Sequence, residues 1–594
     1  MADDRNFWTN RHISRRAALR GAGLGMAGLA GAALIGCGDD DDDAAAAPAA
    51  RPAATAAAAQ ATAAATVDPT AAKRGGTILI TDTQDPATLD PYGSQTYRAK
   101  TVGLYTYSRL FRLATAEGIS GPEVPFGPDV AESFETPDGI NWTIKLKPGV
   151  KMQNVAPLNG RDLTTEDVLY SWGRLSAEES PNSTDIAHVE SIDAVDDRTL
   201  VFKLNAPSPV FIALLGDPND LQIMPVESDG GFDPAQKMIG SGPWIMDEYT
   251  PSVGFKYSAN PDWHEEGFPL VDKFEVVIVP EYANRIAQFE GKNISVVGVN
   301  ANDLIDFSSR HTDTVWSVTR RTLQSFIYFA PTEEQPEAPW VNEPRVRHAF
   351  SMALERDALT EFAYNVDALA VAGLETQNGW NNIVPTGWGP AGGWLDPKSA
   401  DHGDSGQYFQ YNPTESRKLL DAAGYADGFD FKYQYVAGSI YGTDFDAVAE
   451  AHINMFQQIG LNPDIETQDY RAKYFTQTWT GNFTGVAFGY ETPFPEVGQY
   501  FNRQFGDDPA NHSRIDDPEM TDLKNRQAIE LDREARVALW YDIQRANMTK
   551  GYYLPSQAGA NFNYQAYQPE IRGVRQNRSY GFGTEVAPYY WIDA

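Results

Sequence analysis

The sequence predicts an α/β fold with mixed sheets, and two observations support this prediction. In the first part of the chain, apolar residues alternate with polar ones, as in residues 142–150, which is typical of half-buried strands. In the second part, segments with helical periodicity alternate with strand-like segments. The chain has 594 residues, which is enough for more than one domain.

The first part is expected to hold several strands and a capped helix. Residues 77–81 predict a strand, and residues 142–150 and 198–209 predict two strands with one apolar face each. The run 274–280 predicts a strand that is buried on both faces. Thr164, followed by Asp167 three residues later, predicts the start of a helix.

The second part is expected to be richer in helix. Pro344 fits the first turn of a helix whose apolar stripe holds Val346, Phe350 and Ala353. Asn412 and Gly424 are typical of the start and end of another helix, and a third ends at Gly460. Residues 533–550 predict a long amphipathic helix, with Val537, Trp540, Tyr541 and Gln544 spaced along it, and residues 428–436 and 461–468 predict strands.

Residues 1–37 have the pattern of an export signal. Arg15 and Arg16 precede an apolar run that ends at Cys37, the only cysteine. The two arginines resemble a twin-arginine signal, and residues 34–37 resemble the lipobox of bacterial lipoproteins. This resemblance implies export directed by Arg15 and Arg16, and lipid attachment at Cys37. The alternative is an uncleaved transmembrane anchor, which the glycines of the run disfavour.

Residues 38–73 are expected to form a disordered tether, because they are rich in Asp, Ala, Thr and Pro and contain no aromatic residue. The chain as a whole has 47 basic and 81 acidic residues, a formal net charge of −34. Such a surface repels phosphates, so nucleic acid is excluded as an expected partner. A single cysteine excludes disulfides within the chain and cysteine-based metal centres.

No motif of catalysis stands out in the sequence. The eight histidines lack metal-binding spacing, and neither a nucleophile elbow nor a phosphate-binding loop is present. The segment "WHEEG", residues 263–267, could suggest a His/Glu metal site, but we interpret it as a solvated loop because its polar side chains do not share a face. We therefore expect no catalytic residue, no metal and no cofactor.

Several ordered segments of the chain resemble one known family. They include "GGTILITDTQDPATLDP" (75–91), "PDVAESF" (128–134), "TTEDVLYSW" (164–172), "IGSGPWIMDEY" (239–249), "NPDWHEEG" (260–267) and "YNPTESRKLLDAAGY" (411–425). From about Gly75 onward, the chain resembles the extracytoplasmic solute-binding proteins of family 5, the oligopeptide and dipeptide type. The loop "NVAPLNGRDLT" (154–164) departs from the family pattern by an insertion.

This resemblance implies a bilobal fold like that of type II periplasmic binding proteins, with an additional small domain. Lobe I is expected at 74–118, 240–330 and 557–594, the small domain at 119–239, and lobe II at 331–556. The two lobes would close over a solute by a hinge motion. The resemblance further implies a monomer that delivers its solute to the permease subunits of an ABC importer on the extracytoplasmic face of the membrane.

The resemblance also implies ligand-binding residues. Peptide-binding relatives hold the α-ammonium group of the ligand with an acidic residue, and Glu491 stands at the matching position, one methylene longer than the usual Asp. Phe488 and Tyr470 match pocket aromatics, and Gln95 is a further candidate. The competing interpretations are an exposed loop acid for Glu491 and core packing for Phe488 and Tyr470.

Two classes of function stay open at the level of sequence. The first is a transport receptor for a peptide or a related solute, with an oligosaccharide or a nickel complex as alternatives, because relatives of this architecture also bind such solutes. The second is an extracytoplasmic enzyme or sensor built on the same fold. The absence of recognisable catalytic motifs favours the receptor.

Overall fold

The computed structural model describes residues 72–94, 96–115, 126–438, 441–491, 493–494, 496–506, 511–557, 562–575 and 585–593. The chain divides into two compact units, Met1–Ala58 and Ala59–Ala594, and all described residues belong to the second unit. The predicted signal with Arg15, Arg16 and Cys37 therefore lies outside the described residues, as do most of the predicted tether and Gln95.

The first large element is a four-stranded mixed sheet in the order β1-β10-β9-β8. β1 and β10 are parallel although about 190 residues separate them, and the other pairs are antiparallel. The strands are β1 (Thr77–Asp82), β8 (Trp244–Thr250), β9 (Gly254–Ala259) and β10 (Lys273–Ile278). Beside this sheet lie α1 (Tyr97–Gly103) and the short strand pairs β2 (Phe111–Leu113) with β3 (Phe126–Pro128), and β19 (Ile571–Arg572) with β20 (Trp591–Ile592).

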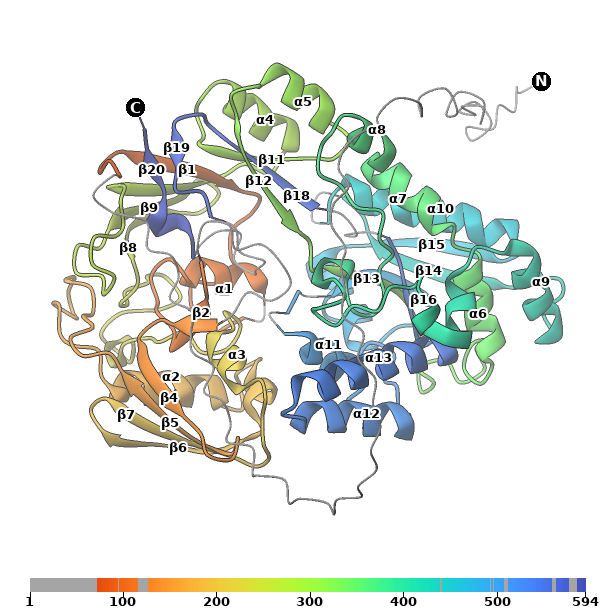
Figure 1. Cartoon of the computed structure of the whole chain (residues 1–594), viewed down its shortest axis with the longest axis horizontal. Coiled ribbons are helices and arrows are strands. Elements are labelled where there is room, and N and C mark those ends of the chain that lie inside the picture. Colours follow the sequence, from red (N-terminus) through yellow and green to blue (C-terminus); the bar gives the residue numbers. More distant parts are fainter. Residues whose placement is uncertain are drawn as a thin grey trace, which may run out of the picture. The chain divides into compact units, whose positions relative to one another are not determined.

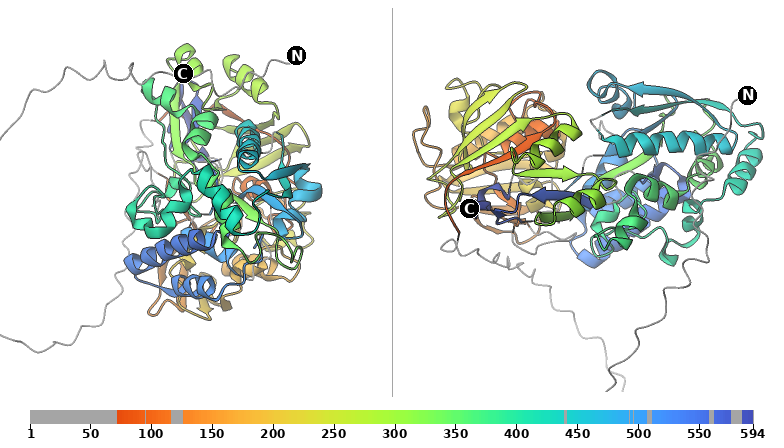
Figure 2. Two further views of the ribbon diagram at one scale, coloured as in Figure 1. Left: turned by 90° about the vertical axis from the view of Figure 1, so that its right-hand side faces the viewer. Right: turned by 90° about the horizontal axis from the view of Figure 1, so that it is seen from above.

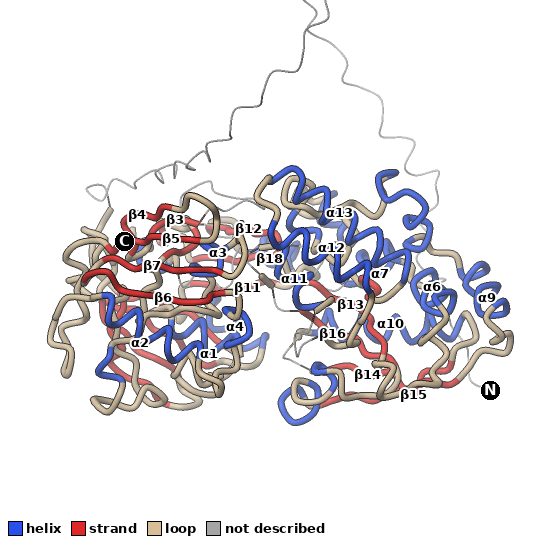
Figure 3. Tube along the Cα trace, turned by 90° about the horizontal axis from the view of Figure 1, so that it is seen from below, coloured by secondary structure: helices blue, strands red, loops and turns tan. Residues whose placement is uncertain are grey.

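An antiparallel four-stranded sheet in the order β4-β5-β7-β6 is formed by residues between β1 and β8 in the sequence. Leu200, Phe202 and Leu204 are buried, as the alternation predicted. Its elements are β4 (Ala131–Glu135), β5 (Asn141–Leu146), β6 (Val189–Asp196) and β7 (Thr199–Leu204), with α2 (Thr165–Ser176) and α3 (Phe211–Gly216) packed nearby (Figure 3).

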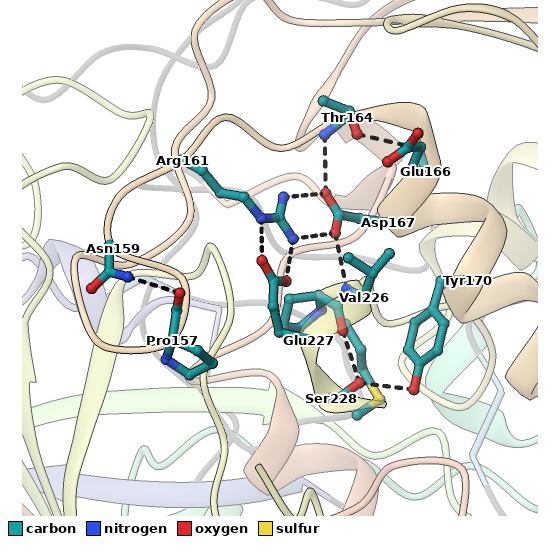
Figure 4. A network of polar contacts seen from close by, with 12 residues as sticks. Pro157, Asn159, Arg161, Thr164, Glu166, Asp167, Tyr170, Val226, Glu227 and Ser228 are labelled. Carbon is teal, nitrogen blue, oxygen red and sulfur yellow. Dashed lines mark hydrogen bonds and ion pairs between the residues drawn. The ribbon is translucent and has the colours of Figure 1, made fainter. Parts of the chain in front are cut away.

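Arg161 holds the inserted loop 154–164 against this sheet's helix α2 (Figure 4). Its guanidinium group donates to Asp167 at 2.7 and 2.9 Å and to Glu227 at 2.6 Å through Nε. Asp167 also accepts from the backbone N–H of Thr164, which completes the predicted capping box at the start of α2. The pKa of Glu227 lies below its ordinary value because Arg161 hydrogen-bonds to its carboxylate.

A three-stranded antiparallel sheet in the order β11-β18-β12 joins the two halves of the body. Its strands are β11 (Val296–Val299), β12 (Val315–Arg320) and β18 (Phe562–Tyr567), and α4 (Tyr282–Glu290) and α5 (Leu304–Arg310) accompany it. The view from above shows these strands, in green and dark blue, between two groups of elements (Figure 2). The chain leaves this sheet after β12 and returns to it before β18.

A five-stranded mixed sheet forms the centre of the second half, in the order β15-β14-β16-β13-β17. Its strands are β13 (Gln324–Phe329), β14 (Asp430–Val436), β15 (Asn462–Gln468), β16 (Val486–Glu491) and β17 (Tyr553–Pro555). Both β13 and β16 are buried on both faces, because one face packs against α6, α7 and α10 and the other against α11 to α13 (Figure 1).

The helices around the five-stranded sheet begin and end largely where the sequence indicated. Asn412 caps α9 by accepting from the backbone N–H of Glu415, and Gly460 follows α10 with a φ of 90°. The helices are α6 (Pro344–Met352), α7 (Arg356–Tyr364), α8 (Val366–Val371), α9 (Pro413–Ala422), α10 (Thr443–Gln458), α11 (Val497–Gln504), α12 (Pro518–Ile529) and α13 (Arg533–Lys550).

Two sequence predictions need correction, the strand at 274–280 and the loop at 263–267. β10 is buried on one face only, through Phe274 and Val276, while its other face is half-buried. The predicted helix 533–550 is confirmed as α13, in which Trp540 and Gln544 are buried and the half-exposed Tyr541 donates its hydroxyl to the carbonyl of Pro390.

The segment 263–267 is not a solvated loop. Trp263 is buried, the His264 imidazole lies 3.2 Å from the carboxylate of Asp129, and Glu265 pairs with Arg112. The neighbouring side chains of His264 and Glu265 therefore contact different partners, Asp129 and Arg112, which their adjacency in the sequence did not reveal.

The predicted lobe boundaries stay a prediction. β13 comes from the range predicted for lobe I and pairs with β16 and β17, which come from the range predicted for lobe II.

Among the described residues, no helix is both long and apolar enough to cross a membrane.

Candidate functional site

A cavity of about 580 Å³ lies beside the segment that links β12 to β13. We call it the crossing cavity, and its floor is the polar face of the three-stranded sheet, with Gly298, Ser317, Thr319, Asn563 and Gln565. The residues that alternate with these, such as Val297, Val318 and Ala566, belong to a hydrophobic cluster on the other side of the sheet. Because of this alternation, the polar face of the sheet lines the crossing cavity.

The opposite wall of the crossing cavity comes from elements around the five-stranded sheet. Tyr364 ends α7, Asp444 stands in the first turn of α10, and Arg321 follows β12. The guanidinium group of Arg321 lies 3.5 Å from the Asp444 carboxylate. Burial lowers the pKa of Arg321, but Tyr490, Tyr364 and Asp444 outweigh it, so the pKa lies above its ordinary value and the side chain stays charged.

The remaining wall carries two arginines that are tied to backbone carbonyls. Arg285, on α4, donates to the carbonyls of Val279 at 2.9 Å and Pro280 at 2.6 Å. Arg575 donates to the carbonyl of Thr115 at 2.9 Å and lies 3.7 Å above the ring of Tyr589. With amides, hydroxyls, three guanidinium groups and the carboxylates of Asp303 and Asp444, the lining suits a polar solute.

Glu491 lies at the end of β16 and is completely buried. Its Oε2 lies 3.3 Å from Nε2 of His512, which is also buried. The other ring nitrogen of His512, Nδ1, lies 2.5 Å from the carbonyl of Trp479, and a carbonyl can only accept. Nδ1 therefore carries a proton, and Nε2 is the ring nitrogen that faces the Glu491 carboxylate.

Tyrosines surround this pair. We define the Glu491 cluster as Glu491, His512, Tyr328, Tyr441, Tyr470 and Tyr474. Tyr328 donates to the hydroxyl of Tyr474 over 3.1 Å, and the rings of Tyr441 and Tyr470 have their centroids 5.7 Å apart. Burial raises the pKa of all four tyrosines, and the Glu491 charge adds to the rise. The cluster is thus a tightly packed polar centre.

The structure places the remaining predicted ligand residues differently. Phe488 is buried in the core beside α10, with its ring stacked on Phe445 at a centroid distance of 4.3 Å, so the geometry favours its packing role. Tyr470 is half-buried at the edge of the Glu491 cluster. Glu491, Phe488 and Tyr470 are absent from the lining of the crossing cavity. Their roles as ligand contacts stay predictions.

The sequence reasoning missed the residues that line the crossing cavity. The alternation of Phe562 and Tyr564 with Asn563 and Gln565 could have predicted a strand with one polar face. No sequence signal connects Arg321 with Asp444, because 123 residues separate them and only the fold brings them together. Among the described residues, no group of three or more His, Cys, Asp or Glu could hold a metal ion.

Comparison with known proteins identifies the family. The profile of the bacterial extracellular solute-binding proteins, family 5, middle region, matches residues 126–512. The chain belongs to this family. It is therefore a solute-binding protein of mixed α/β fold and not an enzyme.

Individual relatives are distant. Heme-binding protein A of Haemophilus influenzae is 24% identical over 477 residues, which cover 76% of this chain and 82% of that protein. The periplasmic binding protein DppA of Helicobacter pylori, solved with the peptide STSA, superposes with a TM-score of 0.69 at 20% identity, covering 88% of this chain and 99% of DppA. The oligopeptide-binding protein AppA of Bacillus subtilis, solved with a nonapeptide, gives 0.70 at 17% identity, covering 88% and 99%.

Proposed function

We propose that this protein is the receptor of an ABC importer, which captures a peptide or a related polar solute in the crossing cavity and delivers it to permease subunits in the membrane. The observation that carries this proposal is the cavity itself. In a chain of the solute-binding family, a space of about 580 Å³ is lined by elements on both sides of a crossing segment. Ligand cavities of this kind have volumes of roughly 300–1,000 Å³.

The chemistry of the lining supports a polar solute over a porphyrin. Heme-binding protein A is named for a largely apolar ligand, but the crossing cavity presents amide, hydroxyl and charged groups over much of its wall. Such groups lose hydrogen bonds to water when an apolar ligand covers them, and each loss costs free energy. A peptide or another solute with many hydrogen-bonding groups replaces those bonds.

Import also requires proximity to the membrane. We propose that Arg15 and Arg16 direct export and that Cys37 carries a lipid, so that the tether 38–73 keeps the folded body, as a monomer, near the permease on the extracytoplasmic face. Membrane fractionation tests this: the full chain is expected in the membrane fraction, and the Cys37→Ala chain in the soluble extracytoplasmic fraction. Equal distribution of both chains would contradict lipid attachment.

Mass spectrometry of the solute that co-purifies with the native protein tests the receptor role. A peptide or another polar small molecule, released on denaturation and rebound intact by calorimetry, is the expected result. Consumption of the rebound molecule by the pure protein, or recovery of heme, would overturn the proposal.

A further inference from the structure

We infer that the solute of the crossing cavity carries a carboxylate or a similar small anion, which binds to Arg321. This inference rests on the proposed function and specifies its solute class. It depends on the charges that line the cavity, on the contacts of each arginine there, and on the state of the Glu491 cluster.

The charge of the crossing cavity is opposite to that of the chain. The whole chain has 81 acidic and 47 basic residues. Among the described residues, the cavity lining has three arginines, Arg285, Arg321 and Arg575, against two carboxylates, Asp303 and Asp444, and neither Lys nor Glu. Positive charge gathered in a concave site raises the local concentration of anions, whereas the rest of this acidic chain repels them.

Arg321 is the arginine best placed to bind an anion. Arg285 and Arg575 each use Nη1 for backbone carbonyls, at 2.6–2.9 Å, which fixes their position. Arg321 lies 3.5 Å from Asp444, which is longer than the ~2.7–2.9 Å of a strong charge-assisted hydrogen bond. A planar guanidinium group in such a loose pair can bind a solute carboxylate through two parallel hydrogen bonds.

The surroundings of Glu491 also support an anionic solute. A solute with an α-ammonium group needs an acceptor, and Glu491 was the predicted one. However, Glu491 is fully buried, and its carboxylate lies 3.3 Å from the imidazole of His512. Glu491 thus lies beside one of the protein's own side chains and does not line the crossing cavity. We therefore expect the residues of the crossing cavity to bind the charged group of the solute.

The first experiment compares the solutes that co-purify with the full-length wild type and with the Arg321→Gln chain. The wild type is expected to release an acidic solute, and Arg321→Gln is expected to bind that solute about 10- to 100-fold more weakly in calorimetry, because a charge-assisted hydrogen bond is lost. Arg321→Lys should show an intermediate loss, since it keeps the charge and loses the planar fork. Arg526→Gln, on the exposed face of α12, is the matched control and should bind like the wild type.

Methyl esterification of the released solute is the second arm. The ester is expected to bind wild type as weakly as the free acid binds Arg321→Gln, with no further loss when both changes are combined. A neutral or purely cationic solute, or equal binding of acid and ester, overturns this inference and leaves the receptor role intact.

If the wild type releases no solute, the probe is a pool of tetrapeptides as free acids and as C-terminal amides. Equal affinity for the two forms overturns the inference, and failure of both forms to bind overturns the proposed peptide receptor with it. Circular dichroism and thermal unfolding of each variant confirm that it is folded.

Discussion

The crossing cavity and the Glu491 cluster both gather charged and hydroxyl groups, but they differ in how those groups are satisfied. In the cavity, Arg321 and Asp444 lie 3.5 Å apart beside empty space, and polar side chains of the three-stranded sheet face it. In the cluster, Glu491 and His512 are completely buried and lie 3.3 Å apart, and Nδ1 of His512 is bound to the carbonyl of Trp479.

This difference distinguishes polar groups that stabilise the fold from polar groups that can bind a solute. A buried polar group without a partner is costly, so groups that the chain already pairs mainly hold the fold in one arrangement. A polar group that faces a cavity can exchange water for a solute at little cost to folding. We therefore expect changes in the Glu491 cluster to affect stability first, and changes in the crossing cavity to affect affinity first.

Removal of Glu491 should give the largest effect. Glu491→Ala leaves the His512 imidazole buried without its partner, which is expected to lower the free energy of unfolding by about 3–5 kcal/mol. Glu519→Ala is the matched control, because Glu519 forms an exposed ion pair with Lys550 and should cost less than about 1 kcal/mol. Chemical denaturation measures both. A cost for Glu491→Ala no greater than that of Glu519→Ala would contradict the structural role, and unchanged affinity for an amine solute would end its role as a ligand residue.

A glycine pair compares the two regions directly. A Cβ atom added at Gly489 on β16 would lie 1.7 Å from the hydroxyl of Tyr474, whereas one at Gly298 on β11 would meet no atom within 4 Å. Gly489→Ala should therefore displace Tyr474, break its contact with Tyr328 and cost about 1–3 kcal/mol.

Gly298→Ala, its partner in this comparison, should leave thermal unfolding essentially unchanged. Equal loss of stability in both alanine variants would show that the cavity wall is packed as tightly as the cluster.

Burial of another histidine, His452, should make the free energy of unfolding depend on pH. Burial lowers its pKa to about 3, and its neutral ring contacts the hydroxyls of Tyr433 and Ser556. Below about pH 6.5, His452 is protonated in the unfolded chain but stays neutral in the folded chain. Its contribution to stability therefore falls as the pH is lowered from 6.5 toward 3.

The His452→Gln variant cannot bind that proton. Its free energy of unfolding should therefore fall less steeply than that of the wild type over the same pH range, as followed by denaturation at several pH values. Parallel curves for the two chains would contradict a neutral, buried His452.

The smallest effect on stability is expected in the floor of the crossing cavity. Asn563 is exposed on β18, so Asn563→Ala should change the free energy of unfolding by less than about 0.5 kcal/mol. It should weaken binding of the co-purified solute by about 1 kcal/mol if one hydrogen bond is lost. Calorimetry and denaturation of the same preparation separate the two quantities, and a loss of stability without a loss of affinity would reverse the expected order.

Sequence patterns were sufficient for local structure where apolar spacing and capping residues act within a few positions. Thr164 with Asp167, and Asn412 with its following Pro413, begin helices as predicted. The matched family also follows from ordered segments along the chain. The helix starts and the family segments each depend on residues within a short stretch, so the pattern of that stretch is enough to predict them.

The candidate site depends on long-range contacts instead. Glu491 was predicted from its position in a motif, but its partner His512 lies in a turn twenty-one residues later, and no local pattern indicates the pair. Phe488 was predicted as a pocket aromatic, yet residues of α10 surround it. Strand alternation fixes which face a side chain occupies, and only the tertiary structure decides whether that face meets a cavity or a core.

The most direct test is a crystal structure of the full chain purified with its native solute. We predict electron density for the solute in the crossing cavity, beside Thr319, Asn563 and Gln565, with its anionic group on Arg321 and the contact between Glu491 and His512 intact. A solute whose ammonium group binds Glu491, with His512 displaced and the crossing cavity empty, would contradict this account.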